Sequence, residues 1–456
     1  MGTMEVPAHA RYGASTARAV ANFPISQERF GRRFLYSLAL LKAAAAEVNR
    51  ELGWLDEEKS RAIVAAAREA MDGKLDDHFV VDIFQTGSGT STNMNANEVI
   101  AHRATELLGR RVHPNDDVNR GQSSNDVIPT VMQLSCLVGL EQDLKPALSR
   151  LAGALGEKSR QFWDVVKTGR THLQDATPIR MGQVFLGFQG QIERGLRRLD
   201  FAVSELAELP LGGTAVGTGV NTHPEFAARV IARMARETGV EIRETGNHFQ
   251  GQNNLDAMIS ASGCLRTVAM SLHKIANDIR FMGSGPRAGL GELRLPEVQP
   301  GSSIMPGKIN PVIPEALIQV VAHVLGNDTA ILHGSYSSYF ELNMMMPMAA
   351  HNLNTAIELL ASATDNFTRA CVQGLEVTRA GPAAVERGLM LATALAPVVG
   401  YDKAAEIAKK AAATGRTIRE MAREMTELSD SELERILEPL SMTEPTATPT
   451  GAAPGG

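Results

Sequence analysis

Apolar residues recur every three or four positions over long stretches of this chain. In one stretch they are Val184, Phe188, Ile192, Leu196, Leu199, Val203 and Leu206. This spacing places them on one face of a helix that no proline interrupts. A second stretch runs from 255 to 282, and a third from 137 to 155, where Pro146 must kink the helix or mark a fresh start. A fourth begins near Glu315, so the pattern predicts a set of long amphipathic helices.

Helices of about 30 residues run roughly 45 Å, which is longer than a small domain is wide. Several must therefore lie side by side as a bundle, and their broad apolar stripes favour packing against further copies of the chain. Alternation with a period of two residues is scarce, so few strands are expected. We predict a mainly α-helical fold with an N-terminal helical domain at 1–121, a central long-helix bundle at 122–355 and a small C-terminal helical domain at 356–442. Residues 443–456, rich in Pro, Gly, Thr and Ala, are expected to form a disordered tail.

Composition excludes several classes of protein. The chain has 456 residues, of which 44% are hydrophobic and 21% charged, as in soluble globular proteins with more than one core. No run of 18 apolar residues exists to span a membrane. A net charge of -6 argues against a general nucleic-acid surface. The N-terminus lacks the apolar stretch of a secretory signal, so we expect a cytoplasmic protein that acts on small molecules.

Neither a metal nor an organic cofactor is expected. Cys136, Cys264 and Cys371 are far apart in apolar helical stretches, which favours small buried thiols over disulfides or metal ligands. No His-Glu-x-x-His motif suggests zinc. The sequence Gly87-Ser88-Gly89 lacks the third glycine and the preceding strand of a dinucleotide-binding loop.

Four polar segments interrupt the helical pattern. They are QTGSGTSTNMNANE at 85–98, HPNDDVNRGQSSND at 113–126, GRTHLQDATP at 169–178 and GSSIMPGKINP at 301–311. Each alone can be explained by helix caps and turns, and a lone histidine such as His172 is more often structural than catalytic. Together they supply hydroxyls and amides for carboxylate oxygens, the charge of Lys308 and a proton carrier in His172. The set indicates a site for a small anionic substrate.

The segment GSSIMPGKINP resembles the signature loop of the fumarase/aspartase superfamily. The other segments are similar to the remaining conserved blocks of that superfamily in the same order, and HPNDDVN, QSSND, GRTHLQDATP and LGGTAVGTGVNTHPE (211–225) resemble class II fumarases in particular. The likeness runs from about Val6 to Leu440. It implies a three-domain, nearly all-helical subunit of a homotetramer, with each active site assembled from three subunits. The implied activity is the reversible hydration of fumarate to (S)-malate by anti addition of water, through an aci-carboxylate intermediate and without a metal.

The resemblance also implies roles for individual residues. Ser302 would be the base that takes the proton, with its alkoxide stabilised by backbone N–H groups and by Lys308. His172 would be the second proton-transfer residue, oriented by Glu315. The implied substrate ligands are Ser88, Thr90, Ser123, Ser124, Asn125, Thr171, Lys308 and Asn310. A secondary anion site is implied at Arg110, His113, Asn115 and Asp116.

Two alternatives remain at the level of sequence. Aspartate ammonia-lyases share the loop and the carbanion chemistry, but they usually have glutamine in place of His172 and threonine within the QSSND block. A non-catalytic tetramer would have lost the loop serine, the lysine or the histidine, and all three are present. Tyr336 and Tyr339 depart from both patterns, since small residues are usual there. These comparisons favour the fumarase.

Overall fold

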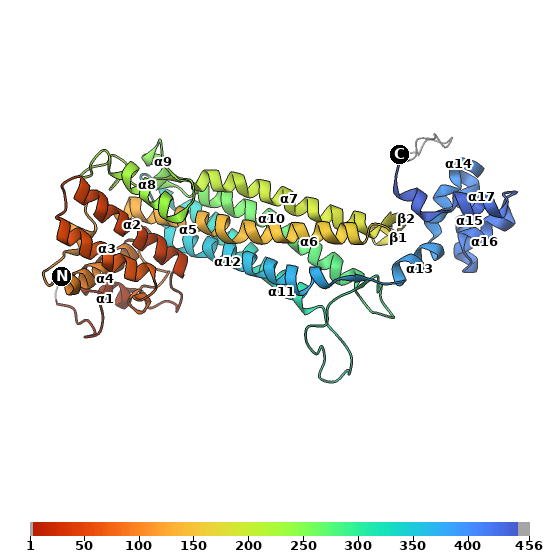
Figure 1. Cartoon of the computed structure of the whole chain (residues 1–456), viewed down its shortest axis with the longest axis horizontal. Helices are drawn as coiled ribbons and strands as arrows, with labels where there is room; N and C mark the ends of the chain where they lie inside the picture. Colours follow the sequence, from red (N-terminus) through yellow and green to blue (C-terminus); the bar gives the residue numbers. More distant parts are fainter. Residues whose placement is uncertain (1–2, 446–456) are drawn as a thin grey trace. The chain divides into compact units, whose positions relative to one another are not determined.

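The computed structural model of the chain describes residues 3–445 and is mainly helical, as predicted (Figure 1). The chain divides into two compact units, each made of three segments. Unit 1 comprises Met1–Ala147, Gly195–Met270 and Gln319–Ser362, and unit 2 comprises Leu148–Arg194, Ser271–Ile318 and Ala363–Gly456. The domain boundaries at 121/122 and 355/356 stay a prediction.

The regular elements are as follows. The helices are α1 (Ala14–Asn22), α2 (Arg32–Glu51), α3 (Glu57–Met71), α4 (Thr90–Leu108), α5 (Ser124–Gly139), α6 (Lys145–Gln161), α7 (Met181–Leu206), α8 (Phe226–Thr238), α9 (His248–Asn253), α10 (Asp256–Met282), α11 (Val312–Gly334), α12 (Met346–Ala370), α13 (Ala380–Arg387), α14 (Ala396–Val399), α15 (Tyr401–Thr414), α16 (Ile418–Met425) and α17 (Asp430–Ile436). The strands are β1 (Val166–Thr171), β2 (Gln174–Arg180), β3 (Glu208–Leu209), β4 (Arg243–Glu244), β5 (Leu293–Arg294), β6 (Ser338–Tyr339), β7 (Leu342–Asn343) and β8 (Glu376–Val377). Within the described residues they form the two-stranded sheets β1–β2, β3–β4, β5–β8 and β6–β7.

The long helices follow the apolar pattern closely. Helices α7 and α10 have 26 and 27 residues and coincide with the first two predicted stretches. Pro146 is the second residue of α6, and the short π-helical turn η3 (Leu140–Leu144) joins α5 to α6 without a break in helical backbone, so the helix widens locally before the proline and does not start afresh there. Helix α11 begins at Val312, three residues before the predicted start, because Pro311 precedes it and Pro314 fits its first turn.

Unit 1 is built on small apolar side chains. Helices α2, α3 and α4 lie side by side (Figure 1) and share a core of Ala43, Ala46, Ile63, Ala66, Ala67, Ile100 and Ala104. Alanines allow the helix axes to approach closely. Helix α5 is buried along its length and is joined to α12 by a hydrogen bond from Asn354 Nδ2 to Ser135 Oγ of 2.9 Å. This packing fixes the N-termini of α4 and α5, where most of the predicted substrate ligands lie.

Unit 2 contains the hairpin β1–β2, parts of the long helices and a small helical cluster. Helices α6 and α7 approach each other here at Gly156 and Gln189, and α10 contacts α7 where Lys274 lies over the ring of Phe188. Helices α13 to α17 surround a core that includes Val385, Leu391, Leu395, Ile407, Ile418, Met421 and Leu433. Arg180 of β2 pairs with Glu444 at 2.6 Å. The predicted disordered tail lies outside the described residues from 446 onward.

The expectation of buried thiols is confirmed for Cys136 and Cys371, and burial raises the pKa of each to about 12. Cys264 is only partly buried, so the expectation is partly wrong for this residue, which lies at the edge of the buried face of α10. In residues 3–445, no helix combines the length and the apolar composition that crossing a membrane would require.

Candidate active site

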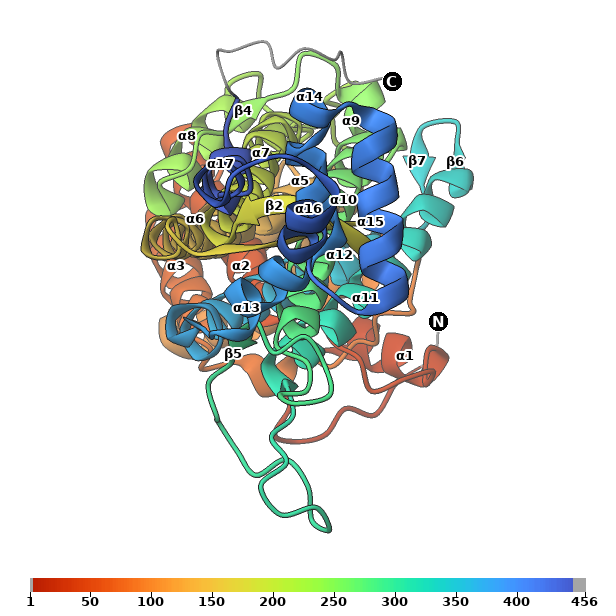
Figure 2. The same ribbon diagram turned by 90° about the vertical axis from the view of Figure 1, so that its right-hand side faces the viewer.

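The polar loop 301–311 connects α10 and α11 through a segment with little regular structure, drawn in green in Figure 2. Ser302 is half-buried, and its Oγ accepts hydrogen bonds from the backbone N–H groups of Ile304 at 3.3 Å and Met305 at 3.0 Å. Backbone donors that converge on one oxygen stabilise negative charge there. The local fold of the loop therefore directs two backbone donors at the oxygen of Ser302.

The two ends of the loop are fastened together by Asn310. Its Nδ2 donates to the carbonyl oxygen of Gly301 at 2.6 Å, and its Oδ1 accepts from Lys308 Nζ at 2.7 Å. A Cβ at Gly301 would lie 2.1 Å from the carbonyl oxygen of Lys308, so only glycine permits this closure. Between these ends Ile304 is 83% exposed, and Met305 and Ile309 are also exposed. The two ends of the loop are thus held together, and the residues between them expose both polar and apolar side chains.

The hairpin β1–β2 carries Thr171 and His172 at its tip. Thr171 pairs with Gln174, and the two turn residues His172 and Leu173 have φ values of 54° and 60°. A two-residue turn with both φ values positive usually contains glycine or asparagine, so a histidine and a leucine here store backbone strain. Both side chains are exposed, and that of His172 makes no hydrogen bond or ion pair within residues 3–445. The expected pairing of His172 with Glu315 therefore stays a prediction.

A buried carboxylate anchors the base of this hairpin. Glu292 is 1% exposed, and its oxygens lie 2.8 Å from Arg170 Nη1 and 3.2 Å from Lys167 Nζ. Burial lowers the pKa of Lys167, and the charge of Glu292 opposes this effect. Arg170 immediately precedes Thr171, so the ion pair restrains the strand that leads to His172. Sequence reasoning missed this anchor, because a lone glutamate in GLGELRL carries no distinguishing signal.

In unit 1, Ser88 and Thr90 lie at the N-terminus of α4. Ser88 is buried, and its Oγ lies 2.8 Å from Thr90 Oγ1. A Cβ at Gly87 would lie 2.0 Å from the carbonyl oxygen of Met344, so the close contact between this turn and the segment that precedes α12 requires glycine. The turn places two hydroxyls side by side at the start of the helix.

Ser123, Ser124 and Asn125 lie at the N-terminus of the neighbouring helix α5. Ser123 caps the helix in a capping box with Asp126, which confirms the simple capping interpretation for that residue. Asn125 Nδ2 donates to the carbonyl oxygen of Ala215 at 2.8 Å. The unpaired N–H groups and the dipole of a helix N-terminus favour anions. The structure therefore brings the predicted ligands of unit 1 together at two adjacent helix N-termini.

A buried polar network that sequence reasoning missed lies behind these ligands. Lys42 of α2 is 0% exposed, and its Nζ donates to Asn119 Oδ1 and Gln122 Oε1, both at 2.9 Å. Burial lowers the pKa of Lys42 to about 7, although the charge of Asp126 acts to raise it. Burial likewise raises the pKa of Asp126, against the hydrogen bonds from the backbone of Ser123, Thr214 and Gly212. A single lysine in the apolar helix LALLKAAAAEV gave no sign of this role.

The predicted secondary anion site is organised mainly by local contacts. Arg110 is exposed and lies 2.9 Å from Asp56 Oδ1 and from Glu58 Oε2. His113 Nδ1 accepts from the backbone N–H groups of Asn115 and Asp116 at 3.2 and 3.1 Å, which caps the π-helical turn η2 (Pro114–Val118). An anion would have to compete with these partners, and the role stays a prediction.

The predicted residues thus fall into two groups. Unit 1 holds Ser88, Thr90, Ser123, Ser124 and Asn125, and unit 2 holds Thr171, His172, Ser302, Lys308, Asn310 and Glu315. The first group can bind carboxylate oxygens, and the second contains the groups that can carry protons. In residues 3–445, no group of three or more His, Cys, Asp and Glu side chains is arranged to hold a metal ion.

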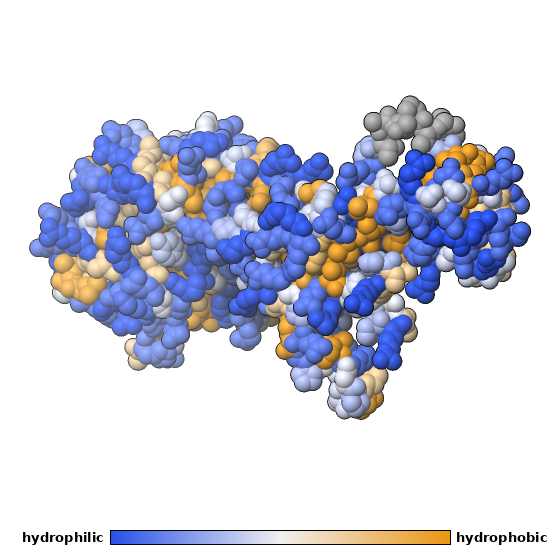
Figure 3. All heavy atoms as spheres, turned by 45° about the vertical axis from the view of Figure 1, so that its right-hand side comes forward, coloured by the Kyte–Doolittle hydropathy of each residue, from blue (hydrophilic) through white to orange (hydrophobic). Residues whose placement is uncertain are grey.

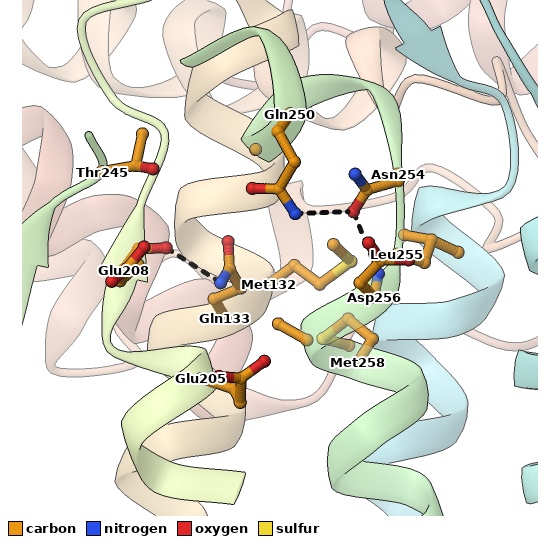
Figure 4. Close-up of a pocket in the computed structure, with 12 residues that line it drawn as sticks. Met132, Gln133, Glu205, Glu208, Thr245, Gln250, Asn254, Leu255, Asp256 and Met258 are labelled. Atoms are coloured by element: carbon orange, nitrogen blue, oxygen red, sulfur yellow. Dashed lines mark hydrogen bonds between the residues drawn. The ribbon is translucent and has the colours of Figure 1, made fainter. Parts of the chain in front are cut away.

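A separate cavity of about 150 Å³ in unit 1 contains none of the predicted residues (Figure 4). Its lining includes the carboxylates of Glu205, Glu208 and Asp256 and the amides of Gln133 and Gln250. Gln133 Nε2 donates to the carbonyl oxygen of Glu208 at 3.0 Å. Carboxylates repel a dicarboxylate, so this cavity does not fit the substrate that the polar segments indicate.

Family models, known proteins and solved structures similar to this chain indicate the family to which it belongs. A family model described as "Lyase" matches residues 2–326, and one described as "Fumarase C C-terminus" matches residues 391–444. The class II fumarate hydratase of Halobacterium salinarum is 55% identical over 449 residues, covering 97% of this chain and 96% of that protein. That of Nitrosomonas europaea is 48% identical over 451 residues, covering 97% and 98%. The crystal structure of recombinant class II fumarase from Schistosoma mansoni superposes with a TM-score of 0.93 at 37% identity, covering 96% of this chain and 97% of that one.

Proposed function

Because this chain belongs to the class II fumarate hydratases, hydro-lyases that hydrate fumarate to malate, we propose that Ser302 and His172 carry the protons of this reaction. The family assignment confirms the prediction of a fumarase over an ammonia-lyase or a non-catalytic relative.

The difficult step in the direction from malate is removal of a proton from the carbon next to a carboxylate. The charge that develops moves onto that carboxylate and forms the aci-carboxylate. In the proposed mechanism the Ser302 alkoxide takes the proton, and Lys308 and Asn310 stabilise the developing charge. His172, oriented by Glu315, assists the departing hydroxide. The observation that carries the proposal is the pair of backbone N–H groups that donate to Ser302 Oγ.

Substrate binding is assigned to the hydroxyl and amide groups at the N-termini of α4 and α5. Ser88, Thr90, Ser123, Ser124 and Asn125 would hold the substrate carboxylates, together with Thr171 of the hairpin. Helix N-termini and hydroxyl donors suit a dianion, which supports this assignment. Arg110, His113, Asn115 and Asp116 would form the weaker secondary anion site.

We further propose that the enzyme is a cytoplasmic homotetramer whose active sites each combine residues from three chains. One chain would supply the ligands of α4 and α5, a second the tip of hairpin β1–β2, and a third the loop 301–311. Exposed apolar side chains on the long helices support association, namely Leu186, Phe201, Met270, Phe281 and Leu332. Figure 3 shows such apolar side chains, in orange, among the hydrophilic ones of the surface.

The base assignment is tested by Ser302→Ala, with Ser303→Ala as the matched control on the same loop. We expect Ser302→Ala to lower kcat for malate dehydration by about 10²- to 10⁴-fold, the range for a general base, while Ser303→Ala keeps nearly full activity. Formation of fumarate is followed by its ultraviolet absorbance. Near-normal turnover by Ser302→Ala would refute the assignment.

A further inference from the structure

Lys42 is a buried cation without a carboxylate partner. It is 0% exposed, and no carboxylate oxygen within residues 3–445 lies at ion-pair distance from its Nζ. Its two hydrogen-bond acceptors are the side-chain oxygens of Asn119 and Gln122. Burying an ammonium group in this way costs free energy, because amide oxygens only partly replace its hydration. A residue that serves stability alone would be better apolar.

A lysine ammonium can only donate hydrogen bonds, so it fixes the orientation of the amides around it. The oxygens of Asn119 and Gln122 must face Lys42, and their NH₂ groups must point away. The contacts agree, since Asn119 Nδ2 donates to the carbonyl oxygen of Gln122 at 3.2 Å. Gln122 Nε2 donates to the carbonyl oxygens of Val118 and Arg120 at 3.1 and 3.2 Å.

The orientation of Asn119 determines that of Asn93 on α4. Asn93 is 1% exposed, and its Nδ2 donates to Asn119 Oδ1 and to Ser124 Oγ, both at 3.2 Å. A flipped Asn93 amide would place its oxygen against the oxygen of Asn119, and the two would repel. Asn93 therefore keeps its NH₂ group toward Ser124, although its own Oδ1 is buried and accepts no hydrogen bond from any residue of 3–445.

Ser124 receives the end of this chain of hydrogen bonds. Its Oγ accepts from Asn93 and makes no other hydrogen bond within residues 3–445. Its hydroxyl proton is therefore available for an acceptor from outside, and a carboxylate oxygen is such an acceptor.

We propose that Lys42 is a positioning residue for substrate binding, which orients Asn119 and Asn93 so that Ser124 presents its hydroxyl as a donor to a substrate carboxylate. The inference rests on the proposed role of Ser124 as a carboxylate ligand. The positive charge of Lys42 adds to the attraction for a dianion. The evident alternative is that Lys42 only holds the turn 119–122 in place.

The direct test replaces Lys42 by methionine, which has a similar length but neither charge nor donors. Affinity is measured with succinate, a dicarboxylate that cannot react, as a competitive inhibitor of malate dehydration. We expect Lys42→Met to weaken succinate binding and to lower kcat/KM by about 10- to 100-fold, as for the loss of charge-assisted hydrogen bonds. We expect its melting temperature to fall, because the replacement leaves Gln122 Oε1 without the donor that Lys42 Nζ provides, so affinity is measured well below the melting temperature. A folded Lys42→Met with unchanged succinate affinity overturns the proposal.

A second variant, Asn93→Ala, breaks the same chain without touching Lys42. We expect a similar loss of affinity, and the double variant should lose little more than either single one, because all three interrupt one pathway. Fully additive losses would contradict the proposal. If Lys42→Met fails to fold, Asn93→Ala still tests the proposal. Normal succinate affinity in Asn93→Ala would then overturn the proposal.

The dependence of binding on pH provides a further readout. Burial lowers the pKa of Lys42 to about 7, with Asp126 on α5 the charged group that acts on it. Lys42 then loses its charge as the pH rises through about 7, so succinate affinity should fall over this range in the wild type and stay flat in Lys42→Met. Ser124→Ala tests the role of Ser124 as a carboxylate ligand separately from the role of Lys42. If Ser124→Ala binds succinate normally, the proposed ligand set is wrong; if it binds weakly while Lys42→Met binds normally, only the role of Lys42 is wrong.

Discussion

The two groups of site residues differ in how the chain holds them. In unit 1 the proposed carboxylate ligands lie at the N-termini of two packed helices, next to the buried network of Lys42, Asn93 and Asn119. In unit 2 the residues proposed to transfer protons lie on exposed segments, the strained turn at His172 and the loop around Ser302. Within residues 3–445, the contacts that restrain them include the hydrogen bonds of the loop and the ion pairs of Glu292.

This contrast indicates a division of labour. Binding a dianion benefits from donors that are already oriented, and burial provides that orientation. Proton transfer needs groups that reach substrate from outside the packed helices and exclude water when they close over it. Within residues 3–445 the exposed His172 side chain makes no hydrogen bond or ion pair, which fits the proposed site shared between chains.

Among the variants that test this difference between the two groups, His172→Asn is expected to have the largest effect. If His172 is the second proton-transfer group, as proposed, its loss should lower kcat by about 10²- to 10⁴-fold and leave succinate affinity nearly unchanged. Steady-state kinetics with succinate inhibition measure both quantities. Gln174→Ala, an exposed change in the same hairpin, is the matched control and should retain activity. Unaltered turnover in His172→Asn would return this histidine to a structural role.

A smaller effect is expected for Glu292→Gln, which weakens the anchor below the hairpin. The buried Lys167 and the Arg170 guanidinium would lose their full counter-charge, so the free energy of unfolding should fall by about 1–3 kcal/mol. Misplacement of His172 should lower kcat about tenfold with little change in succinate affinity. Glu297→Gln, at an exposed glutamate of the same segment, should change neither.

If Glu292→Gln changes succinate affinity but not kcat, the assignment of binding to unit 1 and proton transfer to unit 2 is wrong. Chemical denaturation and the same kinetic assay give the two readouts. Rescue by Glu292→Asp would show that the charge itself, rather than side-chain volume, holds the hairpin.

The long helices could be predicted because their apolar residues repeat at helical spacing over the whole length of each helix. The apolar period of α7 and α10 runs without proline, and both helices appear where expected. The hairpin 166–180 could not be predicted, because its turn uses His172 and Leu173 instead of asparagine and glycine. Strained backbone of this kind clusters at functional sites, which fits the proposed role of His172.

The site was predictable only in part. Hydroxyl and amide residues cluster in the sequence, so Ser88, Ser123 and Ser302 were identifiable as a set of polar segments. Lys42 and Asn93 were not, because each stands among apolar or commonplace neighbours and gains its meaning from contacts between α2, α4 and the 119–122 turn. The same holds for the backbone donors at Ser302, which depend on loop conformation and not on residue type.

The central claim is that separate chains supply Ser302 and His172 to one active site. It is tested most directly by mixing Ser302→Ala and His172→Asn chains, dissociating and reassembling them, and measuring malate dehydration. Random assembly of equal amounts should restore activity to about one quarter of the wild-type sites, although each parent is nearly inactive. Reassembled mixtures that show the mass of the tetramer but no activity above the parents would contradict the shared site.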